Sequence, residues 1–361
     1  MFKKSAIFNK NGISILLYEL EVFIINNISL RNPSITLSRI LGMIFIVLCH
    51  IIQYYSFIPM SESLGQFFNC GVYIFLFISG YLYGGKLIQN FRKWYLKRFF
   101  VVSLPAIIIS VIFIILLLIL GENISVSSIV AYSLDLEGLL FINWKLSEIF
   151  SEIPGLGHLW FTTIIMLCYL LVPLLQWISR IIKPSIWFLI LFFLCGSLIS
   201  ILISDIISVY CFFIFSVGFF ARKINTLNKV AFRSFLIFSI LFVTMIALRL
   251  FLHKYADETI LYSSFVTISH FFVALWFIVS FSFINNKFQD FSAKVVKNKI
   301  ITTLDKYSYY VYLTHGILCM GRLNVFSFFH FSIATLIFII STIISAIVLK
   351  MICNTINRAN R

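Results

Sequence analysis

The stretch SRILGMIFIVLCHIIQYY, residues 38–55, is almost wholly apolar and carries two basic side chains, Arg39 and His50. A helix that crosses a bilayer needs about 20 mainly apolar residues, so this stretch is long enough to span. The two side chains are eleven residues apart. Eleven helical steps return to within about 20° of the starting direction and rise about 16 Å. The sequence therefore predicts a membrane helix with a cation and an imidazole on one face.

The composition extends this reading to the whole chain. Of 361 residues, 61% are hydrophobic and 11% charged, and the mean hydropathy is +1.03. Soluble domains average about 25% charged residues. The seven cysteines include no CxxC pair, which argues against structural disulfides and a zinc site. We expect an all-α polytopic membrane protein.

Ten apolar runs are predicted to span the membrane, near residues 36–58, 67–88, 99–120, 159–179, 185–203, 206–221, 231–252, 262–284, 305–323 and 325–351. With both termini cytoplasmic, the outer side keeps only four of the 28 basic residues, which are Lys145, Arg249, Lys254 and Arg322. Cytoplasmic loops are enriched in Lys and Arg, so this split supports a bundle of about ten helices. The net charge of +15 then reflects topology and anionic lipids, and no nucleic-acid partner is expected.

The domain organisation is simple. Residues 1–33 are predicted to form a cytoplasmic or interfacial leader, 34–352 one transmembrane domain, and 353–361 a short cytoplasmic tail. The acidic residues mostly fall on the predicted outer side, and the longest outer loop, near 121–158, carries five of them.

Ionisable groups inside a membrane helix are costly and are functional candidates by default. Taken alone, Arg39 is explained equally well as a snorkelling topology anchor. The structural alternative for His50 is a hydrogen bond between helices, and the functional interpretation is favoured over it. Together on one face, they favour an anion site at the cytoplasmic mouth and a buried base or nucleophile. Neutral imidazole suits both of those roles near neutral pH.

Several segments then resemble one family in order along the chain. The Arg39-x10-His50 pair is followed by GVYIFLFISGY at 71–81, FRKWYLKR at 91–98, GHLWFTTIIMLCYLLVP at 157–173 and LDKYSYYVYLTHG at 304–316. This order, over about residues 34–350, resembles the bacterial acyltransferase type 3 family, whose members are integral membrane O-acyltransferases of surface polysaccharides.

The resemblance implies a ten-helix, multi-pass enzyme of the bacterial inner membrane. It would take acetyl-CoA from the cytoplasm and acetylate a hydroxyl of a capsule or O-antigen polysaccharide or of an undecaprenyl-linked precursor. His50 would be catalytic, and Arg39, Arg98 and Ser79 would bind the donor. No bound cofactor and no metal are expected.

Two departures from the family pattern refine this expectation. The fourth span reads TTIIMLCY, residues 162–169, without the glutamate that many members carry. This places the chain nearer the branch without attached soluble domains, whose members acetylate capsular, O-antigen or enterobacterial-common-antigen-type sugars. Val101 stands where many members have a second arginine.

The acceptor is expected to enter from the outer side. Candidate cavity residues are His315, His158, Trp160 and Tyr312. Trp160 is explained equally well as an aromatic anchor at the membrane surface, and His315 as a structural histidine. Asp305 is interpreted as a helix N-cap.

Other functional classes remain open at this point. A transporter or flippase of lipid-linked sugars would also use buried Arg and His side chains, although no internal duplication is visible. A polysaccharide polymerase would be expected to show a larger outer loop. A non-catalytic scaffold leaves the aligned pair unexplained.

Overall fold

The structure is a computed structural model that describes residues 32–54, 61–141, 152–202, 207–227, 230–256 and 260–359. Every regular element in these ranges is a helix, which confirms the all-α class. The elements are α2 Pro33–Tyr54, α3 Ser61–Phe68, α4 Cys70–Gly84, α5 Phe91–Val101, α6 Ser103–Ile119, α7 Val126–Ser133, η1 Glu137–Phe141, η3 Gly157–Leu159, α8 Trp160–Leu170, α9 Val172–Ile181, α10 Ile186–Leu202, α11 Ile207–Lys223, α12 Phe232–Ala256, α13 Ile260–Lys287, α14 Gln289–Lys297, α15 Lys299–Cys319, η4 Gly321–Leu323, η5 Val325–Ser327 and α16 Phe331–Ala359.

Six helical stretches in the described residues are long and apolar enough to cross a membrane, and the α8–α9 pair, bent by 40°, gives a seventh. Ten spans and cytoplasmic termini therefore stay predictions. Of the predicted cytoplasmic or interfacial leader, residues 1–33, residues 1–31 lie outside the described residues. The last helix, α16, continues to Ala359 and so includes most of the expected tail.

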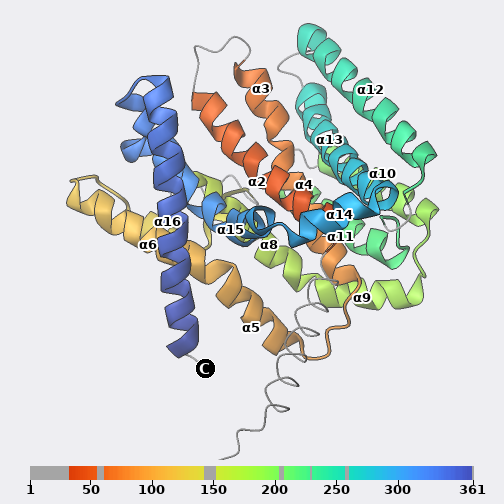
Figure 1. Ribbon diagram of the computed structural model, residues 1–361, viewed down its shortest axis with the longest axis horizontal. Helices are drawn as coiled ribbons and strands as arrows, with labels where there is room; N and C mark the ends of the chain where they lie inside the picture. The colour runs from red at the N-terminus through yellow and green to blue at the C-terminus, as the bar shows by residue number, and fades with distance from the viewer. Residues whose placement is uncertain are drawn as a thin grey trace, which may run out of the picture.

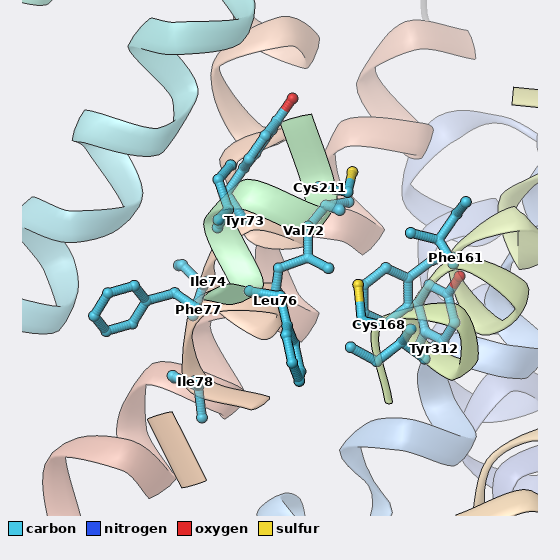
Figure 2. Packing of buried hydrophobic residues seen from close by; sticks show 14 of the residues in the cluster. Val72, Tyr73, Ile74, Leu76, Phe77, Ile78, Phe161, Cys168, Cys211 and Tyr312 are labelled. Carbon is cyan, nitrogen blue, oxygen red and sulfur yellow. The ribbon is translucent and has the colours of Figure 1, made fainter. Parts of the chain in front are cut away.

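Helix α4 lies at the centre of the bundle and buries side chains all round its axis. Figure 2 shows Tyr73 and Phe77 on one side of it, and Phe161 and Tyr312 on the other. Peripheral helices frame this centre: α6 and α16 lie at one edge and α12 at the opposite edge (Figure 1). The core is thus built around the helix that carries the SGY segment.

The Gly80-x3-Gly84 pair allows α4 to pack directly on α11. A Cβ atom on Gly80 would overlap the backbone carbonyl of Phe215, and one on Gly84 would overlap that of Phe219. Small residues at this spacing let two membrane helices approach closely. The overlaps are with backbone atoms of α11, so no movement of a side chain would make room for an added Cβ atom.

We expect Gly80→Ala to destabilise the protein by about 1–3 kcal/mol or more, because the added methyl group forces α4 and α11 apart. Thermal unfolding of the purified protein in detergent measures the loss. Gly85→Ala is the matched control, since its Cβ would meet only the flexible side chain of Arg222. Equal stability of the two variants would contradict the packing role of Gly80.

Candidate functional site

Two contacts at different heights join α2 to α15 and define the site. Arg39 Nη2 donates to Asp305 Oδ2 at 2.5 Å, and His50 Nδ1 lies 2.8 Å from His315 Nε2. The partners on α15 are ten residues apart, so the two helices run parallel. Arg39 and His50 both face α15, as their spacing on one helix face predicts.

The hydrogen bonds around His315 assign the protons of both imidazoles. His315 Nδ1 lies 2.6 Å from the backbone carbonyl of Tyr312. A carbonyl only accepts, so Nδ1 of His315 carries the proton and its Nε2 accepts from His50. In the neutral pair, Nδ1 of His50 is then the donor. His50 Nε2 keeps its lone pair, which is what a general base or a nucleophile requires.

A third histidine, His158, completes the cluster. Its ring centroid lies 4.7 Å from that of His315 and 6.0 Å from that of His50. His158 Nε2 donates to the backbone carbonyl of Leu313 at 3.3 Å, and the Tyr312 hydroxyl donates to the His158 carbonyl. The short η3 helix thus brings His158 into the bundle beside α15. The structure groups three of the predicted acceptor-side residues, His158, His315 and Tyr312, around His50.

These hydrogen bonds use one ring nitrogen of His50, both of His315 and one of His158. No group of three or more His, Cys, Asp or Glu side chains in the described ranges is placed to hold a metal ion.

The predicted donor residues Arg98 and Ser79 belong to a second polar group. Arg98 Nη1 donates to the Tyr83 hydroxyl at 2.9 Å. The rings of Tyr83 and Tyr169 are 5.2 Å apart, and the Tyr169 hydroxyl lies beside Ser79. Helix α5, which carries Arg98, begins at the N-cap Asn90, whose side chain accepts from the backbone of Lys93.

Helix α15 also links this second group to Arg39. The Tyr309 hydroxyl donates to the Val102 carbonyl at 2.7 Å. Tyr309 lies one turn of α15 after Asp305, and Val102 lies one turn after Arg98. Arg39 and Arg98 therefore lie near the same turn of α15. Their guanidinium groups are suitable in kind for the phosphates of an acyl donor.

The interpretation of Asp305 as an N-cap is wrong. Helix α15 begins at Lys299, and its N-cap is Asn298, whose side chain accepts from the backbone N–H groups of Ile300 and Ile301. Asp305 lies inside the helix with a side chain 8% exposed, and it pairs with Arg39, which is 36% exposed. One signal was available in the sequence: Asp305 precedes His315 by ten residues, almost the spacing of Arg39 and His50.

Trp160 is the fourth predicted acceptor-side residue. It is the first residue of α8, and its ring centroid is 6.2 Å from that of Phe161. Phe161 in turn lies 5.8 Å from Tyr312. Trp160 is thus connected to the histidine cluster through one intervening aromatic ring.

Two acids of the predicted outer loop are buried in the bundle. Asp135 and Glu137 are 5% and 2% exposed. The Thr162 hydroxyl donates to Asp135 Oδ1, and the Thr163 hydroxyl donates to the Asp135 carbonyl at 2.8 Å. The segment between α7 and η1 therefore folds back against α8. An apolar context around the acids, SLDLEGLLF, was the sequence signal for this burial.

Burial raises the pKa of Asp135 to about 7, and burial next to Asp135 also raises the pKa of Glu137. A carboxyl with a raised pKa in the folded state holds its proton more tightly when folded. Its contribution to stability is complete below the unfolded pKa and is lost as the pH rises through the folded value.

We therefore expect the protein to lose thermal stability between about pH 4 and about pH 7, and Asp135→Asn to lose less over that range. Thermal unfolding in detergent at a series of pH values measures both slopes. Glu122→Gln, at an exposed acid paired with Arg322, is the control and should keep the wild-type slope. Equal slopes for wild type and Asp135→Asn would contradict the assignment.

Comparison with known proteins gives one match. A family model described as an acyltransferase domain, the acyltransferase type 3 family, matches residues 32–354. No curated protein and no solved structure matches the chain. The matched range includes the residues of the two polar groups described above: the clustered histidines, Arg39, Arg98 and Asp305. The chain belongs to the acyltransferase type 3 family.

Proposed function

We propose that this protein is a membrane O-acetyltransferase of the bacterial inner membrane. It moves an acetyl group from cytoplasmic acetyl-CoA to a hydroxyl of a cell-surface polysaccharide, such as a capsule or O-antigen, or of its lipid-linked precursor. Family membership supports an acyltransferase. The observation that carries the proposal further is the His50–His315 hydrogen bond, which leaves His50 Nε2 unprotonated beside two further imidazoles.

The reaction needs one general base, and overall it neither consumes nor releases a proton. In direct transfer, His50 Nε2 takes the proton of the acceptor hydroxyl while its oxygen attacks the thioester carbonyl. The C–O bond forms, the C–S bond breaks, and the proton passes from His50 to the departing thiolate. If His50 Nε2 attacks the thioester first, the N–C bond forms as the C–S bond breaks and the thiolate departs. The acceptor hydroxyl then attacks this acetyl group, the N–C bond breaks, and the hydroxyl proton passes to the freed His50 Nε2 and from there to the thiolate. His315 holds the imidazole in the tautomer that both routes need.

The two polar groups at the α15 turn provide the donor side. Arg39 and Arg98 would bind the phosphates of acetyl-CoA, with Ser79 near the pantetheine arm. The rise of about 16 Å from Arg39 to His50 is a distance that an extended pantetheine arm can bridge in large part. On the acceptor side, His158, Tyr312, His315 and Trp160 would line the approach of the sugar.

The direct test follows the acetyl group. Membrane vesicles that contain the protein are supplied with acetyl-CoA labelled in the acetyl carbon, together with isolated surface polysaccharide or its lipid-linked precursor. We expect label to appear on the carbohydrate as an ester that mild alkali releases. Vesicles without the protein are the control. Movement of unlabelled carbohydrate across the membrane without any ester would support the transporter alternative instead.

A further inference from the structure

Helix α12 faces outward along most of its length, yet it turns a charged residue inward. Arg249 is 7% exposed, whereas its neighbours Leu248 and Leu250 are 40% and 53% exposed. Burying a guanidinium within a membrane helix is costly, while burying a leucine is not. A helix whose only purpose were to pack on α13 would place the leucines inside, so the inward arginine calls for a specific role.

The partners of Arg249 are both neutral. Its Nη1 donates to His270 Nε2 on α13 at 3.1 Å, and the Tyr262 hydroxyl lies within hydrogen-bonding reach. A guanidinium has no acceptor, so His270 Nε2 is unprotonated. The His270 proton then sits on Nδ1, beside the backbone carbonyl of Gln66. His270 is thus held in its neutral form.

The charge of Arg249 is not balanced within the described part of the chain. The ion pairs found there are Arg39 with Asp305 and Arg322 with Glu122, and neither includes Arg249. A buried charge is normally paired. A planar guanidinium with unused N–H groups matches the geometry of a phosphate or a carboxylate.

Contacts around α2 place this charge at the height of His50. Cys70 lies near both Arg249 and Cys49, and Cys49 directly precedes His50. The backbone of Gln66 belongs to α3, which covers the His50 end of α2: a Cβ atom on Gly65 would meet Cys49 and Gln53. Tyr73, whose ring centroid is 5.6 Å from that of His270, lies across α4 from Tyr312 in Figure 2. Arg249 and the histidine cluster therefore lie on different sides of α4, at the height of the α2 end that carries His50.

We infer that Arg249, supported by His270 and Tyr262, binds an anionic group of the acceptor in the predicted outer half of the membrane. The group is a phosphate that joins the sugar to a lipid carrier, or the carboxylate of an acidic sugar. Holding this anion places the attached sugar next to the end of α2 that carries His50. The inference rests on the proposed function, since it assumes a carbohydrate acceptor.

Binding is tested on the full chain in nanodiscs of phosphatidylcholine with three probes. Farnesyl diphosphate represents a lipid-linked phosphate, octyl glucuronide an acidic sugar and octyl glucoside an uncharged sugar. We expect Arg249→Gln to weaken binding of at least one anionic probe about tenfold or more and to leave octyl glucoside unchanged. The probe that is affected identifies the source of the anion.

The matched control is Arg322→Gln, which removes a guanidinium paired with Glu122 on the same predicted side and should bind all probes like wild type. Arg249→Lys keeps the charge and guards against loss of folding, which size-exclusion chromatography also monitors. Equal binding of both anionic probes by wild type and Arg249→Gln would overturn the inference. So would full competition by phosphatidylglycerol, because Arg249 would then bind ordinary headgroups.

The assay involves no acetyl transfer, so it separates this inference from the proposed function. Loss of anion binding in Arg249→Gln, with no acetyl transfer by wild type, would leave the site standing and refute the enzyme activity. Acetyl transfer by wild type, with unchanged anion binding in Arg249→Gln, would refute the site alone.

Discussion

Replacing His50 by alanine is expected to lower acetyl transfer about 10²–10⁴-fold, which is the usual contribution of a positioned general base. His315 Nδ1 is bound to the Tyr312 carbonyl and His158 Nε2 to that of Leu313, so neither of these two nitrogens is free to replace His50 Nε2. Proton NMR of isolated polysaccharide from cells that express each form measures the O-acetyl signal. Equal signals from wild type and His50→Ala would refute the role of His50.

A pair of substitutions at His315 tests how His50 is positioned. The Gln side chain in His315→Gln keeps an acceptor oxygen for His50 Nδ1, whereas His315→Leu removes it. We expect the glutamine variant to retain clearly more activity than the leucine variant, and the activity of the leucine variant to change its dependence on pH. Equal activity and equal pH profiles would show that His315 only fills space.

The second large effect is expected at Arg39. If its guanidinium binds a phosphate of acetyl-CoA, Arg39→Gln should raise KM for the donor about 10- to 100-fold, as expected for the loss of a hydrogen bond to a charged group. Initial rates at a series of acetyl-CoA concentrations give KM and kcat separately. Arg39→Lys keeps the charge but loses the planar guanidinium group, so its KM should lie between those of wild type and Arg39→Gln. An unchanged KM in Arg39→Gln would remove Arg39 from the donor site.

A substitution at Asp305 is expected to change KM for acetyl-CoA in the opposite direction. Its carboxylate accepts from Arg39 at 2.5 Å and therefore competes with donor phosphates for the same guanidinium. Asp305→Asn removes that competition, so KM for acetyl-CoA should fall. A rise in KM like that of Arg39→Gln would mean that Asp305 instead holds Arg39 in its binding position.

Much of the architecture was readable from neighbouring residues in the chain. Hydropathy predicted helices at all ten positions, and the structure has a helix or a broken helix at each. The spacing of Arg39 and His50 correctly placed both side chains on the face that meets α15. The Gly80-x3-Gly84 spacing, which is typical of close contacts between membrane helices, is also visible in the sequence. These features depend on local periodicity, so one sequence is sufficient to predict them.

Burial was harder to predict from the sequence, because it depends on which other segments of the chain cover a residue. Asp135 and Glu137 belong to a segment that looked like an outer loop, yet contacts with Thr162 and Thr163 hold Asp135 inside the bundle. Arg249 was counted among outer-side cations, but it points inward to His270. The apolar residues around Asp135 and Glu137 are a local sign of their burial, whereas the inward direction of Arg249 does not follow from composition or from distance along the chain.

The periodicity of the first helix was enough to align Arg39 with His50, since every helix repeats in the same way along its axis. The partners that give these two residues a chemical role come from 265 and 266 residues away. Packing of α15 against α2 pairs Arg39 with Asp305 and orients His50 through His315, and η3 adds His158. Only tertiary structure decides such contacts, because which helices pack together in a bundle depends on the complementarity of their whole surfaces and not on their order in the chain.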